Sequence, residues 1–450
     1  MRGRVFHIIA LLLLIAGVSS CFKDPNFDFK ASGEGSGSNL TPSRTESPDV
    51  RNVLLYIAAG FNSLSNFLAD DIQDLESSPL PGRNSPTDPV LLVLSRLPRD
   101  PYYADYLDPV PPVLFRMYAD EKGEPVCDTL LVWSAETPLT KASTLTEAFE
   151  YMNDAFPGNR YGVIYSSHGS GWLPPLYYEN PSHFEPTASY APGKDIRGWH
   201  APEEFPAIQR RGEAPAVKSV GVDSSDGPDL ELDLDAFAAS IPYHLDYILF
   251  DACLMGCVEV AYELREKADL VGFSQTEVLA EGFDYKSLSS HLLTKDPDPE
   301  AVCRDYFNYY NAQSGSKRSA TISLVDTRKM GALEEVCRQL FEKYRVQINS
   351  LPGSLVQGYF RFNRHYFYDL KDILVNAGIT EAETLQLQAA LDQCIQYKAA
   401  TPYFFQGGSY GFAIKNYSGL SMYLPSMGSA YLDNYYLNHI AWNKATSLVK

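Results

Sequence analysis

The chain has 450 residues, 45% of them apolar, which is enough to bury the core of one large domain with an appended lobe or of several domains. Its net charge is −19 and its longest basic clusters are pairs such as Arg210-Arg211, so the sequence argues against a nucleic-acid-binding protein. The acidity bears on solubility and does not identify a substrate.

The N-terminus has the pattern of a bacterial lipoprotein signal. Arg2 and Arg4 precede an apolar run over residues 5–18, and the run ends in Val18-Ser19-Ser20-Cys21. These last four residues resemble a lipobox, which implies cleavage before Cys21 and lipidation of its thiol. An uncleaved membrane anchor is the alternative, but the run is shorter than the roughly 20 residues that span a bilayer. We therefore expect a signal peptide over residues 1–20 and an exported protein, held in the bacterial cell envelope by its lipid, on the periplasmic face or the cell surface.

A flexible tether follows over residues 21–48, which are rich in Gly, Ser, Thr and Pro. Order begins with a near-continuous apolar strand at 52–60, and Asn62 or Ser63 is expected to cap a helix that runs to about Leu75. The next expected elements are a strand at 89–97, a hairpin-like pair at 113–118 and 129–134, and a helix at 143–155. Strands that alternate with helices predict an α/β fold.

Two later apolar strands, at 161–167 and 247–250, end in chemically distinctive blocks. The first is followed by His168-Gly169-Ser170-Gly171-Trp172, and the second by Asp251-Ala252-Cys253-Leu254-Met255-Gly256. Ligands and chemistry collect outside the carboxyl ends of parallel strands. A thiol at such an end, beside the N-terminus of the following helix and near an imidazole, has a lowered pKa and becomes nucleophilic. His168 and Cys253 are thus a candidate catalytic pair.

The two blocks, each behind an apolar strand, resemble the clostripain family of cysteine peptidases, which shares the caspase-like fold with gingipains, legumains and caspases. The resemblance extends over about residues 51–445 and includes segments 281–285, 366–370 and 418–425. It implies a three-layer α/β/α sandwich with a mostly parallel sheet in residues 49–345. Residues 346–450 are then a C-terminal α+β extension that packs on this core.

The expected activity is that of a cysteine endopeptidase acting on a protein or peptide substrate. The Cys253 thiolate would attack the scissile carbonyl, and His168 would transfer protons, including the one given to the leaving amine. Backbone N–H groups of Gly169 and Cys253 would donate to the oxyanion. Gly169 has no Cβ, which lets the backbone approach the substrate. In the family the pair works as a dyad without a third carboxylate.

The resemblance also implies a preference for Arg or Lys at P1, the residue before the cleaved bond. Asp251 matches a family position that helps to form the S1 pocket, where a carboxylate pairs with the P1 cation through charge-assisted hydrogen bonds. Glu277 and Glu281 belong to a later cleft segment, and either could provide a second acid. The alternative for Asp251 is that it caps the helix that follows.

No cofactor is required by this mechanism, and calcium stays an open alternative because some family members use it. The acidic stretch at 223–235 opens like a calcium loop, but its twelfth position is Leu234 where an EF-hand needs Glu. A solvated turn before a helix at 232–240 is the competing interpretation. A zinc site of His168, Cys253 and Cys257 lacks any paired Cys or His motif, so no metal site is assigned.

Residues 173–217, between the two blocks, show little periodicity. In the family this interval lies beside the active site and is cut during activation after a basic residue; a passive surface insertion is the alternative. The candidate cut positions are Lys194, Arg197, Arg210, Arg211 and Lys218.

The rest of the chain continues the α/β pattern, with strands at 268–274 and 320–326 and helices at 301–311 and 328–348. Six cysteines follow Cys21. A nucleophilic Cys253 must stay unpaired, and the five that remain are an odd number. Even if the others form disulfides, at least one more thiol is therefore expected to be free, buried and inert. Two functions of another class remain open: a catalytically silent surface-binding lipoprotein on the same scaffold, and a glycan-binding lipoprotein that uses the many Tyr and Trp residues.

Overall fold

The structure is a computed structural model, and it describes residues 51–60, 62–83, 88–97, 110–175, 177, 184, 232–360, 366–407 and 411–450. The predicted signal peptide, Cys21, the tether up to residue 48, residues 223–231 of the acidic stretch and the candidate cut positions lie outside these residues. No helix in the described ranges is long and apolar enough to cross a bilayer.

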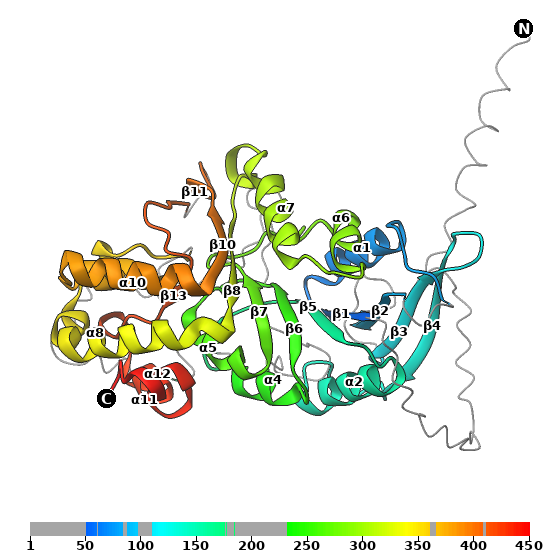
Figure 1. Ribbon diagram of the computed structural model, residues 1–450, viewed down its shortest axis with the longest axis horizontal. Helices are drawn as coiled ribbons and strands as arrows, with labels where there is room; N and C mark the ends of the chain where they lie inside the picture. The colour runs from blue at the N-terminus through cyan, green and yellow to red at the C-terminus, as the bar shows by residue number, and fades with distance from the viewer. Residues whose placement is uncertain are drawn as a thin grey trace, which may run out of the picture.

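Within the described chain, nine strands form one mixed sheet in the order β10-β8-β7-β6-β5-β1-β2-β3-β4 (Figure 1). Their bounds are β1 Asn52–Ala59, β2 Val90–Arg96, β3 Val113–Ala119, β4 Pro125–Val132, β5 Arg160–Ser166, β6 Leu245–Asp251, β7 Ala268–Phe273, β8 Thr321–Asp326 and β10 Ile395–Ala400. The central strands β2, β1, β5, β6 and β7 are parallel, and the outer pairs are antiparallel. β1 and β2 are buried along their whole length, as their continuous apolar sequences predict for parallel strands covered on both faces.

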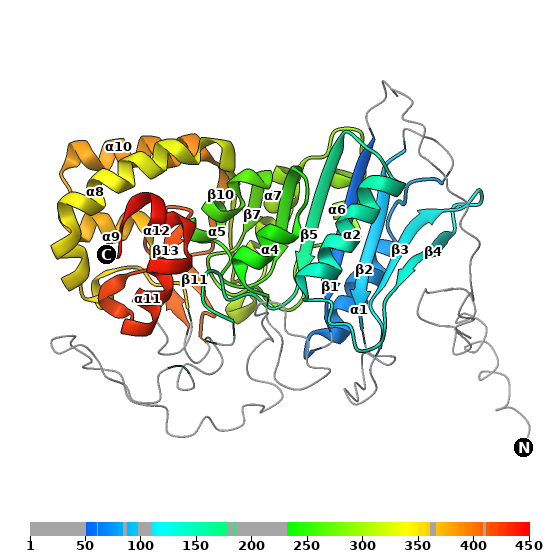
Figure 2. The same cartoon turned by 90° about the horizontal axis from the view of Figure 1, so that it is seen from below.

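Helices cover both faces of this sheet, which confirms the predicted three-layer α/β/α arrangement. One face carries α1 Ser65–Glu76, α6 Tyr285–Leu292 and α7 Pro299–Asn311 (Figure 1). The other face carries α2 Ala142–Ala155, α4 Leu234–Ser240 and α5 Val258–Glu263 (Figure 2). Both helical layers contribute apolar side chains to one continuous core.

The C-terminal region is a helical lobe at the β10 side of the sheet (Figure 1). Its helices are α8 Met330–Ser350, α9 Leu370–Asn376, α10 Glu381–Cys394, α11 Ala430–His439 and α12 Ala441–Thr446. Short strands pair within it, β9 Tyr368–Asp369 with β13 Ser421–Met422 and β11 Tyr403–Phe404 with β12 Phe412–Ala413. Between α10 and β11 the chain enters the large sheet as β10, antiparallel to β8, so the sheet is shared by the core and this region.

Most element bounds lie within about two residues of the sequence-based expectations, although β4 begins at Pro125 where the sequence predicts a start at 129. α1 begins at Ser65, because Asn62 Oδ1 accepts from the Leu64 N–H (2.8 Å) in a turn that precedes the helix. The helix after the cysteine block begins only at Val258. The expectation that Cys253 lies next to a helix N-terminus was therefore wrong, since a turn over residues 253–256 separates the two.

Candidate active site

His168 and Cys253 are delivered by neighbouring parallel strands. β5 pairs with β6 in a register that sets Ser166 opposite Asp251, and the two residues of interest each follow two positions later. Because both strands run the same way, their carboxyl ends meet at one edge of the sheet. Ser166 and Asp251 are 85 residues apart in the chain, and so are His168 and Cys253. The structure thus brings an imidazole and a thiol from distant segments to the same edge of the sheet.

The backbone after His168 presses against the backbone of the cysteine turn. A Cβ on Gly169 would lie 2.1 Å from the Cys253 carbonyl oxygen and 2.7 Å from the Cys253 nitrogen. Gly171 has φ +62°, and a Cβ there would lie 2.7 Å from the carbonyl oxygen of Leu254. Leu254 itself has φ 61°, a left-handed conformation that costs free energy for a residue with a branched side chain. The close contact between the His168 loop and the cysteine turn therefore depends on Gly169, Gly171 and the left-handed conformation of Leu254.

The His168 side chain is oriented by a residue that the sequence offered only as a helix cap. His168 is 8% exposed, and its Nε2 lies 3.2 Å from Ser63 Oγ in the turn between β1 and α1. Which of the two atoms donates depends on the tautomer of the ring. No motif signals this contact, because it joins segments 105 residues apart.

The Cys253 thiol is covered by the segment that follows β7. Cys253 is 1% exposed, and its Sγ accepts from the Val278 N–H at 3.2 Å. The same segment runs along the cysteine turn, where the Leu254 N–H donates to Thr276 O (2.9 Å) and the Gly256 N–H donates to Ser274 O (2.7 Å). In this conformation the thiol is close to residues 274–278 and shielded from solvent.

Asp251 is completely buried at the end of β6. Its Oδ2 accepts from Tyr285 OH (2.9 Å) and Ser166 Oγ (3.2 Å). Burial, and next the charge of Asp251, raise the pKa of Tyr285 well above its ordinary value, which keeps the phenol a donor. The alternative role as a helix cap is wrong, because α5 has Cys257 as its N-cap residue and no side-chain cap.

The two glutamates of the later cleft segment have different surroundings. Glu281 is partly exposed, and its Oε1 forms an ion pair with Lys317 Nζ at 3.2 Å. Glu277 is only 5% exposed. Of the two, Glu281 is therefore the carboxylate that a cationic ligand can reach without first unpacking the core.

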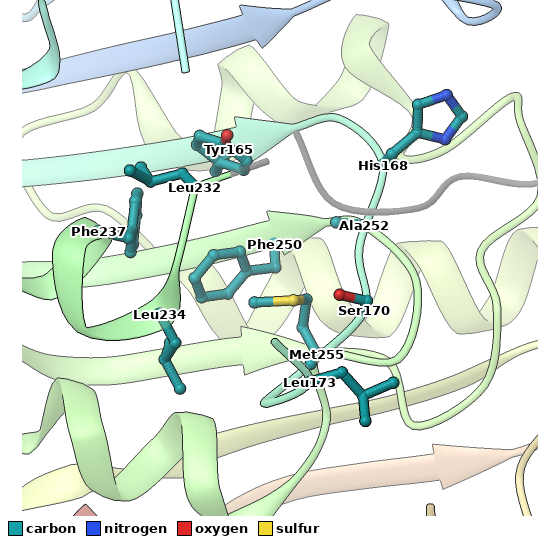
Figure 3. A pocket seen from close by; sticks show the side chains of 11 residues that line it. Tyr165, His168, Ser170, Leu173, Leu232, Leu234, Phe237, Phe250, Ala252 and Met255 are labelled. Carbon is teal, nitrogen blue, oxygen red and sulfur yellow. The ribbon is translucent and has the colours of Figure 1, made fainter. Parts of the chain in front are cut away.

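An apolar pocket opens beside His168 on the α4 side of the sheet. Tyr165, Phe237 and Phe250 line its aromatic part, and the His168 ring points away from them (Figure 3). Successive strand residues point to opposite faces, so Phe250 and Asp251 face opposite layers of the sandwich. Asp251 and the apolar pocket thus lie on opposite faces of the sheet.

Burial disfavours the thiolate form of the other free cysteines. In the ranges that the structure covers, the cysteines with free thiols are Cys253, Cys257, Cys303, Cys337 and Cys394, and all are buried. Burial raises the pKa of Cys257, Cys303 and Cys337, and it raises the pKa of Cys394 to about 12. In the described chain no group of three or more His, Cys, Asp or Glu side chains could hold a metal ion, and this includes the alternative zinc ligands His168, Cys253 and Cys257.

Comparison with solved structures identifies the fold. The chain is 25% identical, with a TM-score of 0.67, to the inactive zymogen of a C11 protease from Parabacteroides distasonis, over 89% of this chain and 99% of that one. It is 22% identical, again with a TM-score of 0.67, to a secreted C11 cysteine protease from Bacteroides thetaiotaomicron in complex with an irreversible peptide inhibitor, over 88% and 99% of the two chains. These likenesses confirm the caspase-like α/β fold.

The family comparison agrees with the structural one. No curated protein matches the chain. The family model of the clostripain peptidases matches residues 209–447, which is more than half of the 450 residues. The chain therefore belongs to the clostripain family and is a cysteine-type endopeptidase.

Proposed function

We propose that this peptidase cleaves peptide bonds with Cys253 as nucleophile and His168 as the proton-transferring partner. The observation that carries the proposal is the register of β5 and β6, which sends both residues to one edge of the sheet two positions beyond the pair Ser166 and Asp251. Cys257 is not a substitute, because it is fully buried at the start of α5 and burial raises its pKa.

The reaction proceeds in two halves. His168 takes the Cys253 proton, and the thiolate attacks the scissile carbonyl carbon to give a tetrahedral oxyanion, to which the backbone N–H groups of Gly169 and Cys253 donate. The C–N bond then breaks, His168 gives its proton to the leaving amine, and a thioester to Cys253 remains. His168 next takes a proton from water, which attacks the thioester carbon; the C–S bond then breaks, the new carboxyl group leaves, and His168 returns the proton to the Cys253 sulfur.

Substrate has to displace the segment over the thiol before this can begin. The Val278 N–H donates to Cys253 Sγ and Cys253 is 1% exposed, so the sulfur is shielded from a scissile carbonyl in the conformation described here. An extended substrate peptide could replace residues 274–278 as the hydrogen-bond partner of the cysteine turn. The site would then open with little net loss of hydrogen bonds. Cleavage within residues 173–217 after a basic residue is a second route to activation.

The proposed preference is for Arg or Lys at P1. Asp251 supplies a buried carboxylate two residues before Cys253, and Glu281 supplies one that is partly exposed to solvent. A cation between two carboxylates is bound by charge-assisted hydrogen bonds, which neutral P1 residues cannot form.

The proposed setting is the bacterial cell envelope. The signal-like residues 1–20 and the lipobox-like end at Cys21 support export and lipid anchoring, with residues 21–48 as tether. A similar protein from Bacteroides thetaiotaomicron is described as secreted and was solved with a peptide inhibitor, which supports export and a peptide substrate for this chain too. We propose that residues 49–345 form the catalytic core and that residues 346–450 pack on it and add β10 to its sheet.

Hydrolysis of fluorogenic peptides with Arg, Lys, Asp or Leu at P1 tests the proposal. Turnover of the basic peptides should disappear in Cys253→Ala and His168→Ala, while Cys257→Ala, the matched control, retains it. Asp251→Asn should reduce hydrolysis of the basic peptides more than hydrolysis of the Leu peptide. Undiminished activity of Cys253→Ala would overturn the assignment of the nucleophile. Trypsin treatment and added calcium, each in a separate reaction, show whether a cut or the ion is needed.

A further inference from the structure

Glu259 is a buried carboxyl on α5, six residues after the proposed nucleophile. It is 0% exposed, and its Oε1 accepts from the Tyr423 N–H (2.8 Å) and from Tyr436 OH (2.7 Å). Both donors belong to the C-terminal region, Tyr423 just after β13 and Tyr436 in α11. Glu259 Oε2 has no hydrogen-bond partner within the described residues. One oxygen thus binds the C-terminal region to the helix behind the cysteine turn.

The same two tyrosines contact the loop that carries His168. The ring of Trp172, four residues after His168, is fully buried, and its centroid lies 4.8 Å from that of Tyr423 and 5.1 Å from that of Tyr436. Both ring pairs have edge-to-face geometry, which fixes relative orientation as well as distance. Tyr423 and Tyr436 therefore touch the histidine loop with their rings and the helix behind the cysteine turn with their donors.

A second contact holds the cysteine turn to the same part of the C-terminal region. The Ser421 N–H donates to Gly256 O at 2.9 Å, in a bridge between β13 and the end of the turn. The position of Cys253 relative to His168 thus depends on residues 421–436 as well as on the register of β5 and β6.

We propose that Glu259 is a positioning residue, which fixes the His168 loop relative to Cys253 through Tyr423, Tyr436 and Trp172. This rests on the proposed roles of His168 and Cys253. Glu259 touches no reacting atom, and its effect is on geometry alone. Small misplacement of reacting groups has large effects on rate, and an error of about 1 Å costs on the order of 100-fold. The effect should therefore appear in kcat more than in KM.

The charge state of Glu259 makes this positioning of the His168 loop depend on pH. Burial raises the pKa of Glu259 to about 7, against hydrogen bonds from Tyr423 and Tyr436 that lower it. The groups that face the carboxyl are the Tyr423 N–H, the Tyr436 hydroxyl and, on its own element, the Cys257 thiol. The folded pKa lies above the ordinary value of 4.5, so the stabilisation is complete below pH 4.5 and is lost as pH rises through about 7. The neutral acid is the form that fits the buried site.

The test compares Glu259→Gln, Glu259→Ala and Tyr436→Phe with Tyr262→Phe in the full-length protein. Tyr262 is the matched control: it is a buried tyrosine of α5 whose OH donates to Glu334 Oε2 at 2.7 Å, the same length as the Tyr436 bond. The readouts are kcat and KM for a peptide with Arg at P1, from pH 5.5 to 9, with thermal midpoints for each variant.

Glu259→Gln keeps the acceptor oxygen and cannot ionise, so its kcat should match the parent below pH 7 and exceed it increasingly above pH 7. Glu259→Ala and Tyr436→Phe should lower kcat by about tenfold or more with KM changed less, following the cost of misplaced groups. Tyr262→Phe should match the parent.

Equal kcat for Tyr436→Phe and Tyr262→Phe, together with a constant ratio of Glu259→Gln to parent across pH, would overturn the proposal. Activity that survives in Cys253→Ala would instead remove the proposed function. If Glu259→Ala does not fold, Glu259→Gln and Tyr436→Phe still decide the question.

Discussion

Gly169 lies against Cys253 so closely that a Cβ on the glycine would come within 2.1 Å of the Cys253 carbonyl oxygen. Since that neighbour is backbone, Gly169→Ala has to move either the loop that carries His168 or the turn that carries Cys253. We expect kcat/KM for Arg or Lys peptides to fall by about 100-fold, the effect of a displacement near 1 Å. Gly331→Ala is the control, because a Cβ on Gly331 meets nothing within 4 Å. Equal activity of both variants would mean that the loops do not depend on this contact.

Covering of the thiol by Val278 predicts slow alkylation. Cys253 is 1% exposed, so iodoacetamide should modify it at least about tenfold more slowly than a free cysteine, since reaction needs local opening. Mass spectrometry of the Cys253 peptide measures the rate, with the fully buried Cys337 as reference. Labelling of Cys253 at the rate of free cysteine, with Cys337 still protected, would show that residues 274–278 do not hold this position in solution.

Lys317 forms an ion pair with Glu281, the carboxylate proposed to bind the P1 cation. If Glu281 binds the P1 side chain, Lys317→Ala should lower KM for Arg peptides by up to about fivefold, because an exposed ion pair contributes about 0–1 kcal/mol. Lys343→Ala, which removes a similar exposed lysine from Glu383, is the matched control. An unchanged KM in Lys317→Ala would argue that Glu281 lies outside the S1 pocket.

The contacts of Glu383 lead us to expect that Glu383→Gln is less stable than the parent by an amount that depends on pH. Its carboxylate accepts from Lys343 Nζ, the Thr380 N–H and Tyr344 OH, and Lys343 foremost lowers its pKa to about 2. The folded pKa lies below the ordinary 4.5, so the stabilisation is present above pH 4.5 and is lost as pH falls through about 2. Calorimetry should show Glu383→Gln melting below the parent at pH 7, with a gap that narrows towards pH 3. Glu381→Gln is the control. A difference in melting temperature between Glu383→Gln and the parent that does not change with pH, or that equals the difference for Glu381→Gln, would contradict the lowered pKa of Glu383.

The features of the fold and of the candidate site that the sequence predicted are those that a local pattern of residues determines. The apolar runs of β1, β5 and β6 and the blocks behind them led to the α/β/α fold and to the neighbouring ends of two strands. Contacts such as Ser63 with His168, Val278 with Cys253 and Tyr436 with Glu259 could not be predicted. They join residues far apart in the chain through single side chains or backbone groups, and neither periodicity nor spacing encodes them. Asp251 shows a third case, since its position was foreseen but its hydroxyl donors Tyr285 and Ser166 were not.

The late strands set an order of events during synthesis. β10 adds an edge strand to the large sheet, and the Ser421 N–H that donates to Gly256 O comes later still. A chain that has emerged only as far as β8 already holds His168 and Cys253 but lacks both of these supports. We therefore expect the arrangement of His168 and Cys253 seen in the full chain to form only after residue 421 has been synthesised.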